Sequence, residues 1–366
     1  MVGIRARLEK SLLSAALLSI AALTPLVSTP AQAQSPDKVI FAWPGGGSSG
    51  LAPFSFADAL GFLKQENLTL DIINLQGAGI VLPQLVSGAI TTSYITLDPL
   101  VIARQPGKPN FDVRFVYNAV RRSPWEIAVL DSSPIRSVKD LDGKTIGVGA
   151  LTFGNVPMTK AILARSGVKA EFVGVGTGAT AFHALTSGRI DALNLWDVQN
   201  ANLEATGAKI RRLALPPEFS SAAGHSLPVT NKLIKERPDI IARFGRAVAK
   251  GTLACDANPE GCLAAYWAQF PKSKPQGTNA EAVQYEMPLL QSRLRNMVWW
   301  KDGEPHRFGA FSENDWTVTI DSLRTGGVID NSDIKLDTLY TNQFVDEYNK
   351  FDRDDVTRKA KAYRAE

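Results

Sequence analysis

Histidine, cysteine and concentrated charge are scarce in this sequence, and each scarcity excludes a class of function. The 366 residues include only 3 histidines and 2 cysteines. His183, His225 and His306 are isolated from one another, without the spacing of metal ligands. The formal net charge is only +4, and the basic residues are dispersed rather than gathered into a run. We therefore expect no metal site, no cofactor and no nucleic-acid partner.

Long apolar runs are also scarce, and the clearest one lies near the N-terminus. Basic residues precede an apolar run at residues 11–23, and small residues at 31–33 suit a cleavage site. The alternative is a membrane anchor, which we disfavour because the run is too short to span a bilayer comfortably. We predict a signal peptide over residues 1–33, cleaved after about Ala33, and a mature protein in the periplasm.

The two cysteines lie close together. Cys255 and Cys262 flank a segment that contains Pro259 and Gly261, which is typical of a turn. In an exported protein such a pair most simply forms a disulfide, and we predict one here. Two free thiols are the alternative. A metal site is disfavoured because no histidine or third cysteine is near.

One short pattern occurs twice, about a hundred residues apart. Residues 84–90 and 184–190 share Leu, Ser-Gly and Ile at the same spacing. Each copy follows a Gly-x-Gly turn and runs into an apolar segment typical of a strand. The match continues upstream, where residues 39–43 correspond to 145–149 and residues 68–73 to 168–173. The sequence therefore predicts two similar βαβαβ units, and a ligand commonly lies between such bodies.

Strand and helix patterns alternate through both units, which indicates an α/β fold with a largely parallel sheet in each. In the first unit we expect a helix at 53–65 and strands at 91–97 and 113–120. After residue 231 the pattern is mostly helical, with helices expected at 238–256, 259–270, 280–297, 313–326 and 341–351. Too few strands remain there for a third sheet, so these helices must pack onto the first unit.

The chain then passes between the two units twice, and each unit becomes one lobe. We expect the crossings near residues 131–136 and 218–226. This divides the chain into lobe I, at 34–132 and 223–366, and lobe II, at 133–222. Two crossings form a hinge that can close a cleft around a ligand.

Four stretches carry a resemblance to a known family. They are residues 53–62, the two Leu-x-Ser-Gly-x-Ile repeats, residues 140–148, and a tail with Trp316, Leu323, Gly326-Gly327-Val328-Ile329 and residues 340–344. By their order and spacing, the chain resembles the nitrate/sulfonate/taurine and thiamine-pyrimidine (SsuA/THI5-like, NMT1-type) periplasmic substrate-binding proteins of ABC importers. The resemblance covers nearly all of the mature chain.

The resemblance implies the type II periplasmic-binding-protein fold, with two βαβ lobes, a hinge and a helical C-terminal extension on lobe I. It also implies a small-molecule solute and a partner, the membrane permease of an ABC importer with its ATPase, and we expect a monomer. The family includes enzymes of pyrimidine synthesis, but their clustered cysteines and active-site histidine are not matched by Cys255 and Cys262. We therefore expect a binding protein rather than an enzyme.

Ligands of open α/β sheets bind at the carboxyl ends of the strands, where loops meet helix N-termini. Aromatic residues near these strand ends either sandwich a planar ligand or pack in the core. They are Trp43, Tyr94, Trp125, Phe153 and Trp196. The same loops supply further residues that we expect to contact the ligand: Gly47, Ser48, Gln76, Gly77, Thr96, Thr152, Asn155, Thr177 and Gly178.

Two charged residues complete the expected site. Arg121 suits a carboxylate or sulfonate, or else forms a solvated or inter-lobe pair with its neighbours. Asp197 accepts from an amino group of the ligand, or caps the helix that follows it. Helix N-termini expected at 79–80 and 178–179 favour anionic groups. The set fits a sulfonate, nitrate, taurine, a pyrimidine or an aromatic carboxylate.

One catalytic pattern gives a competing interpretation. Gly46-Gly47-Ser48-Ser49-Gly50 matches the Gly-x-Ser-x-Gly pattern of a nucleophile elbow, between a strand and a helix. An exported serine hydrolase using Ser48 is the alternative function, although no histidine has the sequence context of a triad. No lysine follows these glycines, so the loop is not a P-loop.

Overall fold

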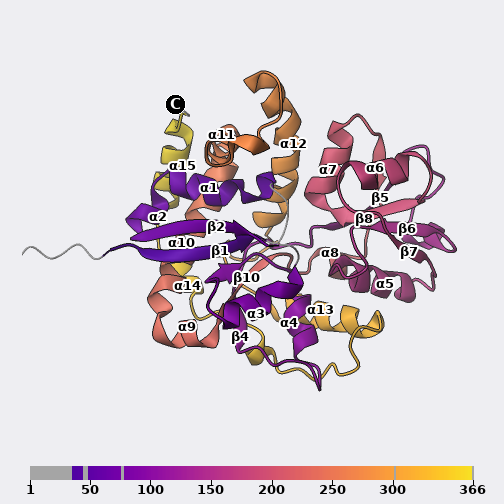
Figure 1. Cartoon of the computed structure of the whole chain (residues 1–366), viewed down its shortest axis with the longest axis horizontal. Coiled ribbons are helices and arrows are strands. Elements are labelled where there is room, and N and C mark those ends of the chain that lie inside the picture. Colours follow the sequence, from indigo (N-terminus) through magenta and orange to yellow (C-terminus); the bar gives the residue numbers. More distant parts are fainter. Residues whose placement is uncertain (1–34, 44–47, 76–77, 301, 365–366) are drawn as a thin grey trace, which may run out of the picture. The chain divides into compact units, whose positions relative to one another are not determined.

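Two groups of three parallel strands repeat the same order along the chain (Figure 1). The computed structural model describes residues 35–43, 48–75, 78–300 and 302–364. In one group β1 lies between β2 and β3, and in the other β6 lies between β7 and β8. The strands are β1 Asp37–Trp43, β2 Leu68–Asn74, β3 Thr92–Ser93, β6 Thr145–Val148, β7 Glu171–Gly174 and β8 Ala192–Trp196. The predicted pair of similar units is confirmed.

The repeated sequence pattern ends a helix in the same way in both units. Helices α3 (Val81–Val86) and α6 (Ala179–Thr186) stop just before a glycine with positive φ, +76° at Gly88 and +73° at Gly188. Other residues are strained at such angles, so glycine is the residue that lets the chain leave the helix here. Two residues later, an isoleucine is buried in each unit as the chain turns toward β3 or β8.

The remaining strands add antiparallel pairs. β4 (Val113–Asn118) pairs with β10 (Ser226–Thr230). β5 (Trp125–Leu130) pairs with β8 on one side and with β9 (Ile210–Arg212) on the other. The five-stranded sheet β7-β6-β8-β5-β9 is therefore mixed, and the expected parallel arrangement holds only for the three strands of each repeat.

The pairing of β5 corrects one predicted crossing. We expected the chain to pass between lobes near residues 131–136, after β5, but β5 is hydrogen-bonded within the five-stranded sheet. The crossing therefore lies between β4 and β5, where the Val120 amide donates to the His225 carbonyl at 2.9 Å. This bond holds it beside the second crossing. We use lobe I for the part built on β1–β4 and β10, and lobe II for the part built on β5–β9.

The long C-terminal helices lie close to where the sequence placed them, and the shorter elements differ. Gly61, with φ of +71°, divides the helix expected at 53–65 into two. The helix expected at 341–351 is only α14. The strand expected at 91–97 is reduced to β3 and an isolated antiparallel bridge between Ile95 and Ser226. The other helices are α1 Ala52–Ala59, α2 Phe62–Gln65, α4 Asp98–Ala103, α5 Asn155–Arg165, α7 Asp197–Ala205, α8 Pro217–Ser220, α9 Asn231–Glu236, α10 Pro238–Ala257, α11 Pro259–Gln269, α12 Asn279–Met297, α13 Glu313–Thr325, α14 Val345–Tyr348 and α15 Arg353–Ala362.

The C-terminal helices complete the core of lobe I, as expected. Phe41 of β1 contacts Phe54 of α1 and Phe244 of α10, with ring centroids 4.7 and 6.4 Å apart. The predicted disulfide between Cys255 and Cys262 is present and joins α10 to α11. Within the described residues no helix is both long enough and apolar enough to cross a bilayer. The predicted signal peptide lies outside those residues.

Candidate functional site

A continuous series of aromatic ring contacts runs from lobe I to lobe II. In order, the rings of this ring series are Trp43, Tyr94, His225, Trp125, Trp196 and Phe153. Tyr94 is stacked between Trp43 and His225, with centroids 5.1 and 4.9 Å away. The contact between the lobes joins His225 to Trp125 at 6.1 Å. All five aromatic residues predicted from the sequence thus lie in one cluster.

Strand pairing explains why these rings meet. β1 and β3 are parallel neighbours, with Ala42 opposite Ser93, so the next residues along, Trp43 and Tyr94, come side by side. In lobe II, Trp125 and Trp196 are direct partners in the antiparallel ladder between β5 and β8. Residues opposite one another on such a ladder point to the same face. Each lobe therefore presents a pair of adjacent aromatic rings at the ends of its strands.

A buried ion pair lies beside the ring series and also joins the lobes. Asp197, the first residue of α7, accepts from Arg293 Nη2 on α12 at 2.8 Å. Its carboxylate also accepts from Asn296 Nδ2 at 2.7 Å and from the Val198 amide at 2.8 Å. Asp197 is 1% exposed and Arg293 3%. Burial raises the pKa of Asp197, and Arg293 and Asn296 oppose that shift. Three donors to one carboxylate favour its ionised form.

Arg293 connects this ion pair to the rings. Its Nη1 lies 3.4 Å from His225 Nδ1. Burial and the Arg293 charge lower the pKa of His225 well below its usual value, so this ring is neutral. Burial raises the pKa of Tyr94 to about 12, although the nearby guanidinium opposes the rise. The tyrosine therefore keeps its hydroxyl proton and is a hydrogen-bond donor at neutral pH.

A second carboxylate contacts lobe II from lobe I. Asp98, at the start of α4, lies against Gly154, which precedes α5. A Cβ at Gly154 would fall 2.5 Å from the Asp98 Oδ1 atom. Burial raises the pKa of Asp98, and a hydrogen bond from Thr96 opposes the shift. A cavity of about 20 Å³ lies here, lined from both lobes by residues that include Asp98, Trp125 and Met158. This volume is on the scale of one water molecule.

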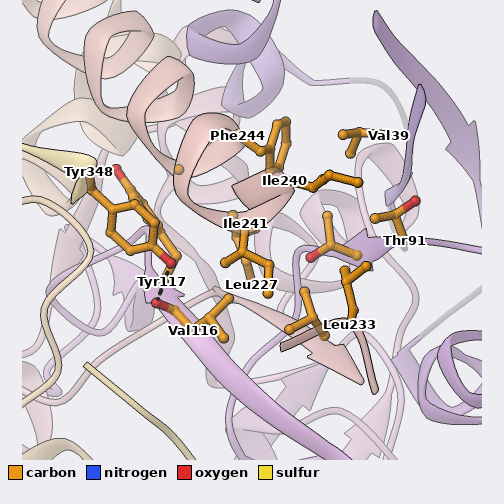
Figure 2. Close-up of a pocket in the computed structure, with 13 residues that line it drawn as sticks. Val39, Thr91, Val116, Tyr117, Leu227, Leu233, Ile240, Ile241, Phe244 and Tyr348 are labelled. Carbon is orange, nitrogen blue, oxygen red and sulfur yellow. Dashed lines mark hydrogen bonds between the residues drawn. The ribbon is translucent and has the colours of Figure 1, made fainter. Parts of the chain in front are cut away.

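A second small cavity lies inside lobe I and has a different character (Figure 2). It also measures about 20 Å³ and is lined mainly by apolar side chains of β4, β10 and α10. Tyr348 lies at its edge, where its hydroxyl donates to the Val116 carbonyl at 3.1 Å. No charged side chain lines it among the described residues. We interpret it as a packing void of the lobe I core.

The remaining predicted site residues have varied surroundings. Ser48 caps the short turn before α1, and its Oγ accepts from the Gly50 amide at 3.3 Å. Asn155 is fully buried, and its side-chain amide donates to Asn194, so it stabilises β8 rather than facing a ligand. The Gly178 amide donates to Gln199 Oε1 of α7 at 2.9 Å. Thr152 and Thr177 are exposed. Gly47, Gln76 and Gly77 lie outside the described residues.

Arg121 is committed to contacts within its own lobe. Its guanidinium donates to the backbone carbonyls of Trp299 and Ala310 at 3.0 and 3.1 Å. It also pairs with Glu304 at 3.1 Å and lies 4.3 Å from the centre of the Trp300 ring. The side chain is buried and its partners belong to lobe I, so Arg121 is a structural residue of that lobe rather than the solvated or inter-lobe pair given above as the alternative. The arginine next to the ring series is Arg293 instead.

Sequence reasoning missed Arg293 and His225, and only the first had a readable signal. Arg293 shares one face of α12 with Leu289, Leu290 and Met297, all buried. A charged residue at a position where the helical period calls for an apolar one indicates a buried partner. His225 carries no such pattern, because its position depends on the two crossings meeting.

Comparison with known proteins identifies the family of this chain. Residues 48–262, more than half of the chain, match the family described as "NMT1/THI5 like". The chain belongs to this family. The resemblance predicted from the sequence is therefore confirmed.

The sequence relatives and structural neighbours of this chain are mostly binding proteins. The riboflavin-binding protein RibY of Chloroflexus aurantiacus is 23% identical over 252 residues, covering 67% of this chain and 68% of that protein. The alkanesulfonate-binding protein SsuA of Xanthomonas axonopodis pv. citri, bound to MOPS, superposes with a TM-score of 0.61 at 15% identity, covering 84% of this chain and 100% of that one. The desulfurization enzyme DSZB has a TM-score of 0.53 at 16% identity, covering 85% and 98%.

These likenesses establish the periplasmic-binding-protein fold, the fold of solute-binding components of ABC-type import systems. The predicted fold is confirmed. An enzyme also occurs on this fold, so the fold itself is not specific to binding. The serine hydrolase alternative finds no support, because Ser48 Oγ caps a short turn and the similar proteins named above include no serine hydrolase. No group of His, Cys, Asp and Glu in the described part of the chain could hold a metal ion.

Proposed function

We propose that this protein is the periplasmic solute-binding component of an ABC importer, and that it captures a planar aromatic solute between lobes I and II. Membership of the NMT1/THI5-like family and the binding-protein fold support the first half of the proposal. The ring series supports the second half. It brings aromatic side chains from β1, β5 and β8, and from the residue after β3, to a single place.

A planar solute gains from such rings in a way that a small anion does not. Stacked and edge-to-face aromatic pairs contribute about 0.5–1.5 kcal/mol beyond the area they bury. Nitrate or taurine needs a few donors and little aromatic surface. The family relative that binds riboflavin by name takes a planar aromatic ligand. Among the solutes expected from the sequence, we therefore favour pyrimidines and larger heteroaromatic compounds over nitrate, taurine and aliphatic sulfonates.

The two crossings would allow the lobes to part and close. His225 lies at one crossing and Trp125 immediately after the other, so the ring series meets at the hinge side of the site. A solute that contacts rings of both lobes stabilises the closed form by its contacts with the second lobe. The closed form would then engage a membrane permease with its ATPase. Export by the segment 1–33 would place the mature protein, as a monomer, in the periplasm.

The proposal is tested by titrating the mature chain, residues 34–366, with a panel of solutes while tryptophan fluorescence and heat of binding are recorded. The panel holds riboflavin, an aminopyrimidine, 2-naphthamide, an alkanesulfonate, taurine and nitrate. We expect binding by one or more planar aromatic solutes, with quenching of tryptophan fluorescence. Trp125→Ala and Trp196→Ala should each weaken that binding by about tenfold.

Trp300→Ala is the matched control, since Trp300 packs on Arg121 and His306, away from the ring series. It should leave affinity unchanged. Tight binding of the alkanesulfonate or taurine, with no aromatic solute bound and no effect of the two tryptophan substitutions, would overturn the proposal.

A further inference from the structure

Two buried polar groups beside the ring series form no hydrogen bond of good geometry with the described residues. They are Arg293 Nε and the Tyr94 hydroxyl, which are inaccessible to solvent and lie near each other, since the guanidinium opposes the rise in the pKa of the tyrosine. An unpaired buried polar group costs about 1–3 kcal/mol, so such groups are rare unless something else satisfies them. Both belong to side chains that are otherwise firmly held. Arg293 is fixed by Asp197, and the Tyr94 ring is stacked on both faces.

Both donors lie close to the Trp43 ring, at the lobe I end of the ring series. A Cβ at Gly50 would lie 3.4 Å from the Trp43 ring and 3.9 Å from Arg293 Nε. Gly50 therefore marks a point where the first ring of the series and the free edge of the guanidinium come close. Tyr94 stacks on that same Trp43. An oxygen atom on a stacked planar solute could reach donors held in this way.

The charges around these donors balance. The Arg293 charge is balanced by Asp197 at 2.8 Å, and the neutral ring of His225 adds none. Asp98 adds a carboxylate on the lobe I side, and Arg122, which donates to Asn296 beside Asp197, adds a guanidinium. Both helix N-termini at this interface are already complemented by carboxylates, α7 by Asp197 and α5 by Asp98. A buried anion would therefore bring uncompensated charge, which is costly away from water.

From this geometry we infer that Arg293 and Tyr94 are the specificity-determining donors of the site, and that they select an uncharged acceptor oxygen, such as a ring carbonyl or carboxamide, over an anion. This deepens the proposed function and rests on it. Asp197 positions Arg293 and neutralises it, so that the arginine acts here as a hydrogen-bond donor rather than as an anion clamp. The ligand class is a planar heteroaromatic compound with a carbonyl group.

The inference is tested with three probes that share one ring system: 2-naphthamide, 2-naphthoate and 2-methylnaphthalene. They offer a neutral acceptor, an anion and no acceptor. Dissociation constants are measured by calorimetry and fluorescence on the mature chain at pH 7. We expect naphthamide to bind at least about tenfold more tightly than naphthoate, because the charge of Arg293 is already balanced by Asp197.

Three variants separate the roles. Tyr94→Phe should weaken naphthamide binding by about threefold to tenfold and leave 2-methylnaphthalene unchanged, since only the hydroxyl is lost. Tyr266→Phe is the matched control, a buried tyrosine of lobe I whose ring contacts Phe270 rather than the ring series. Arg293→Lys should weaken naphthamide binding while keeping its preference over naphthoate. Asp197→Asn should move the ratio of the two affinities toward naphthoate by about tenfold or more, because Arg293 is then unneutralised.

The outcomes distinguish this inference from the proposed function. The inference would be overturned if the unmodified protein bound naphthoate as tightly as naphthamide or more tightly, and if Tyr94→Phe and Arg293→Lys left both affinities unchanged. The proposed function, binding of a planar aromatic solute, would still stand. Absence of binding by all three probes and by riboflavin would overturn both. Thermal melting of each variant shows whether it is folded. If Asp197→Asn does not fold, Tyr94→Phe and Arg293→Lys are sufficient for the test.

Discussion

Replacing Asp197 with alanine should destabilise the protein far more than removal of a surface carboxylate does. The Asp197 carboxylate accepts three hydrogen bonds, and its charge balances that of Arg293. Both side chains are almost completely buried, 1% and 3% exposed. Deleting one member of such a pair leaves the other charged and desolvated, which costs about 3–5 kcal/mol. The neutral His225 ring and the Tyr94 hydroxyl beside the guanidinium do not balance its charge.

The double variant Asp197→Ala/Arg293→Met supplies the decisive comparison. It removes both charges and fills part of the space with an apolar side chain of similar length. Because the penalty comes from the stranded charge, the double variant should be less destabilised than Asp197→Ala alone, by about 2 kcal/mol or more. Asp346→Ala is the surface control. Asp346 pairs with Arg307 while 81% exposed, so its loss should cost about 1 kcal/mol or less.

Urea unfolding at pH 7, followed by tryptophan fluorescence and by circular dichroism, measures these differences. Agreement between the two probes checks that unfolding is two-state, which a two-lobed chain does not guarantee. If Asp197→Ala and the double variant are equally destabilised, no stranded charge is involved. If Asp197→Ala matches Asp346→Ala, the pair is not buried as described. Either result would refute the reasoning.

Two further predictions concern stability. Cys255→Ser/Cys262→Ser opens a crosslink between residues only 7 apart in sequence, so the free energy of unfolding in urea should fall by only about 2–3 kcal/mol; no loss would mean that the crosslink does not constrain the unfolded chain. Burial raises the pKa of Asp315 to about 6, so its protonation favours the folded state. The resulting stability is fully present below the unfolded pKa of 3.8 and is lost as pH rises through 6. Asp315→Asn should remove this trend, which amounts to about 2–2.5 kcal/mol between pH 4 and pH 7, and an unchanged pH dependence across that range would contradict it. The folding of this variant is checked by thermal melting, because Asp315 also accepts from the Ala223 amide at the second crossing.

The sequence was most informative where local chemistry repeats. The Leu-x-Ser-Gly-x-Ile pattern predicted two equivalent units because a glycine with positive φ and a buried isoleucine are local requirements of the helix-to-strand turn. The lobe to which β5 belongs could not be predicted in this way. Its apolar run fits a strand of either lobe, and its pairing with β8 and β9 is what assigns it to lobe II. Strand partners are set by tertiary packing rather than by the strand's own residues.

The same distinction applies to the site. Trp43 and Tyr94 could be predicted to meet, because parallel strands end at one edge of a sheet and bring their last residues together. Trp125 instead begins β5 and meets Trp196 through antiparallel pairing. The arginine could not be chosen by its neighbours in sequence. Arg121 lies next to a strand end, as a binding arginine should, yet its donors are used by the backbone of residues 299–310. Arg293 comes from α12, far along the chain, and reaches the rings only through the packing of α12 on α7.

The helix N-termini show why ligand charge is a poor inference from sequence. A free helix N-terminus favours an anion, and this made sulfonate or nitrate attractive ligands. At the interface described here, however, α7 begins with Asp197 itself, and Asp98 lies against the residue before α5. An incoming anion would have to displace a carboxylate that is already in place, or sit beside it. A planar, uncharged solute meets no such competitor, and it could satisfy Arg293 Nε and the Tyr94 hydroxyl at the same time. The proposed ligand class thus depends on which charges at the interface already have partners, which helix position alone does not reveal.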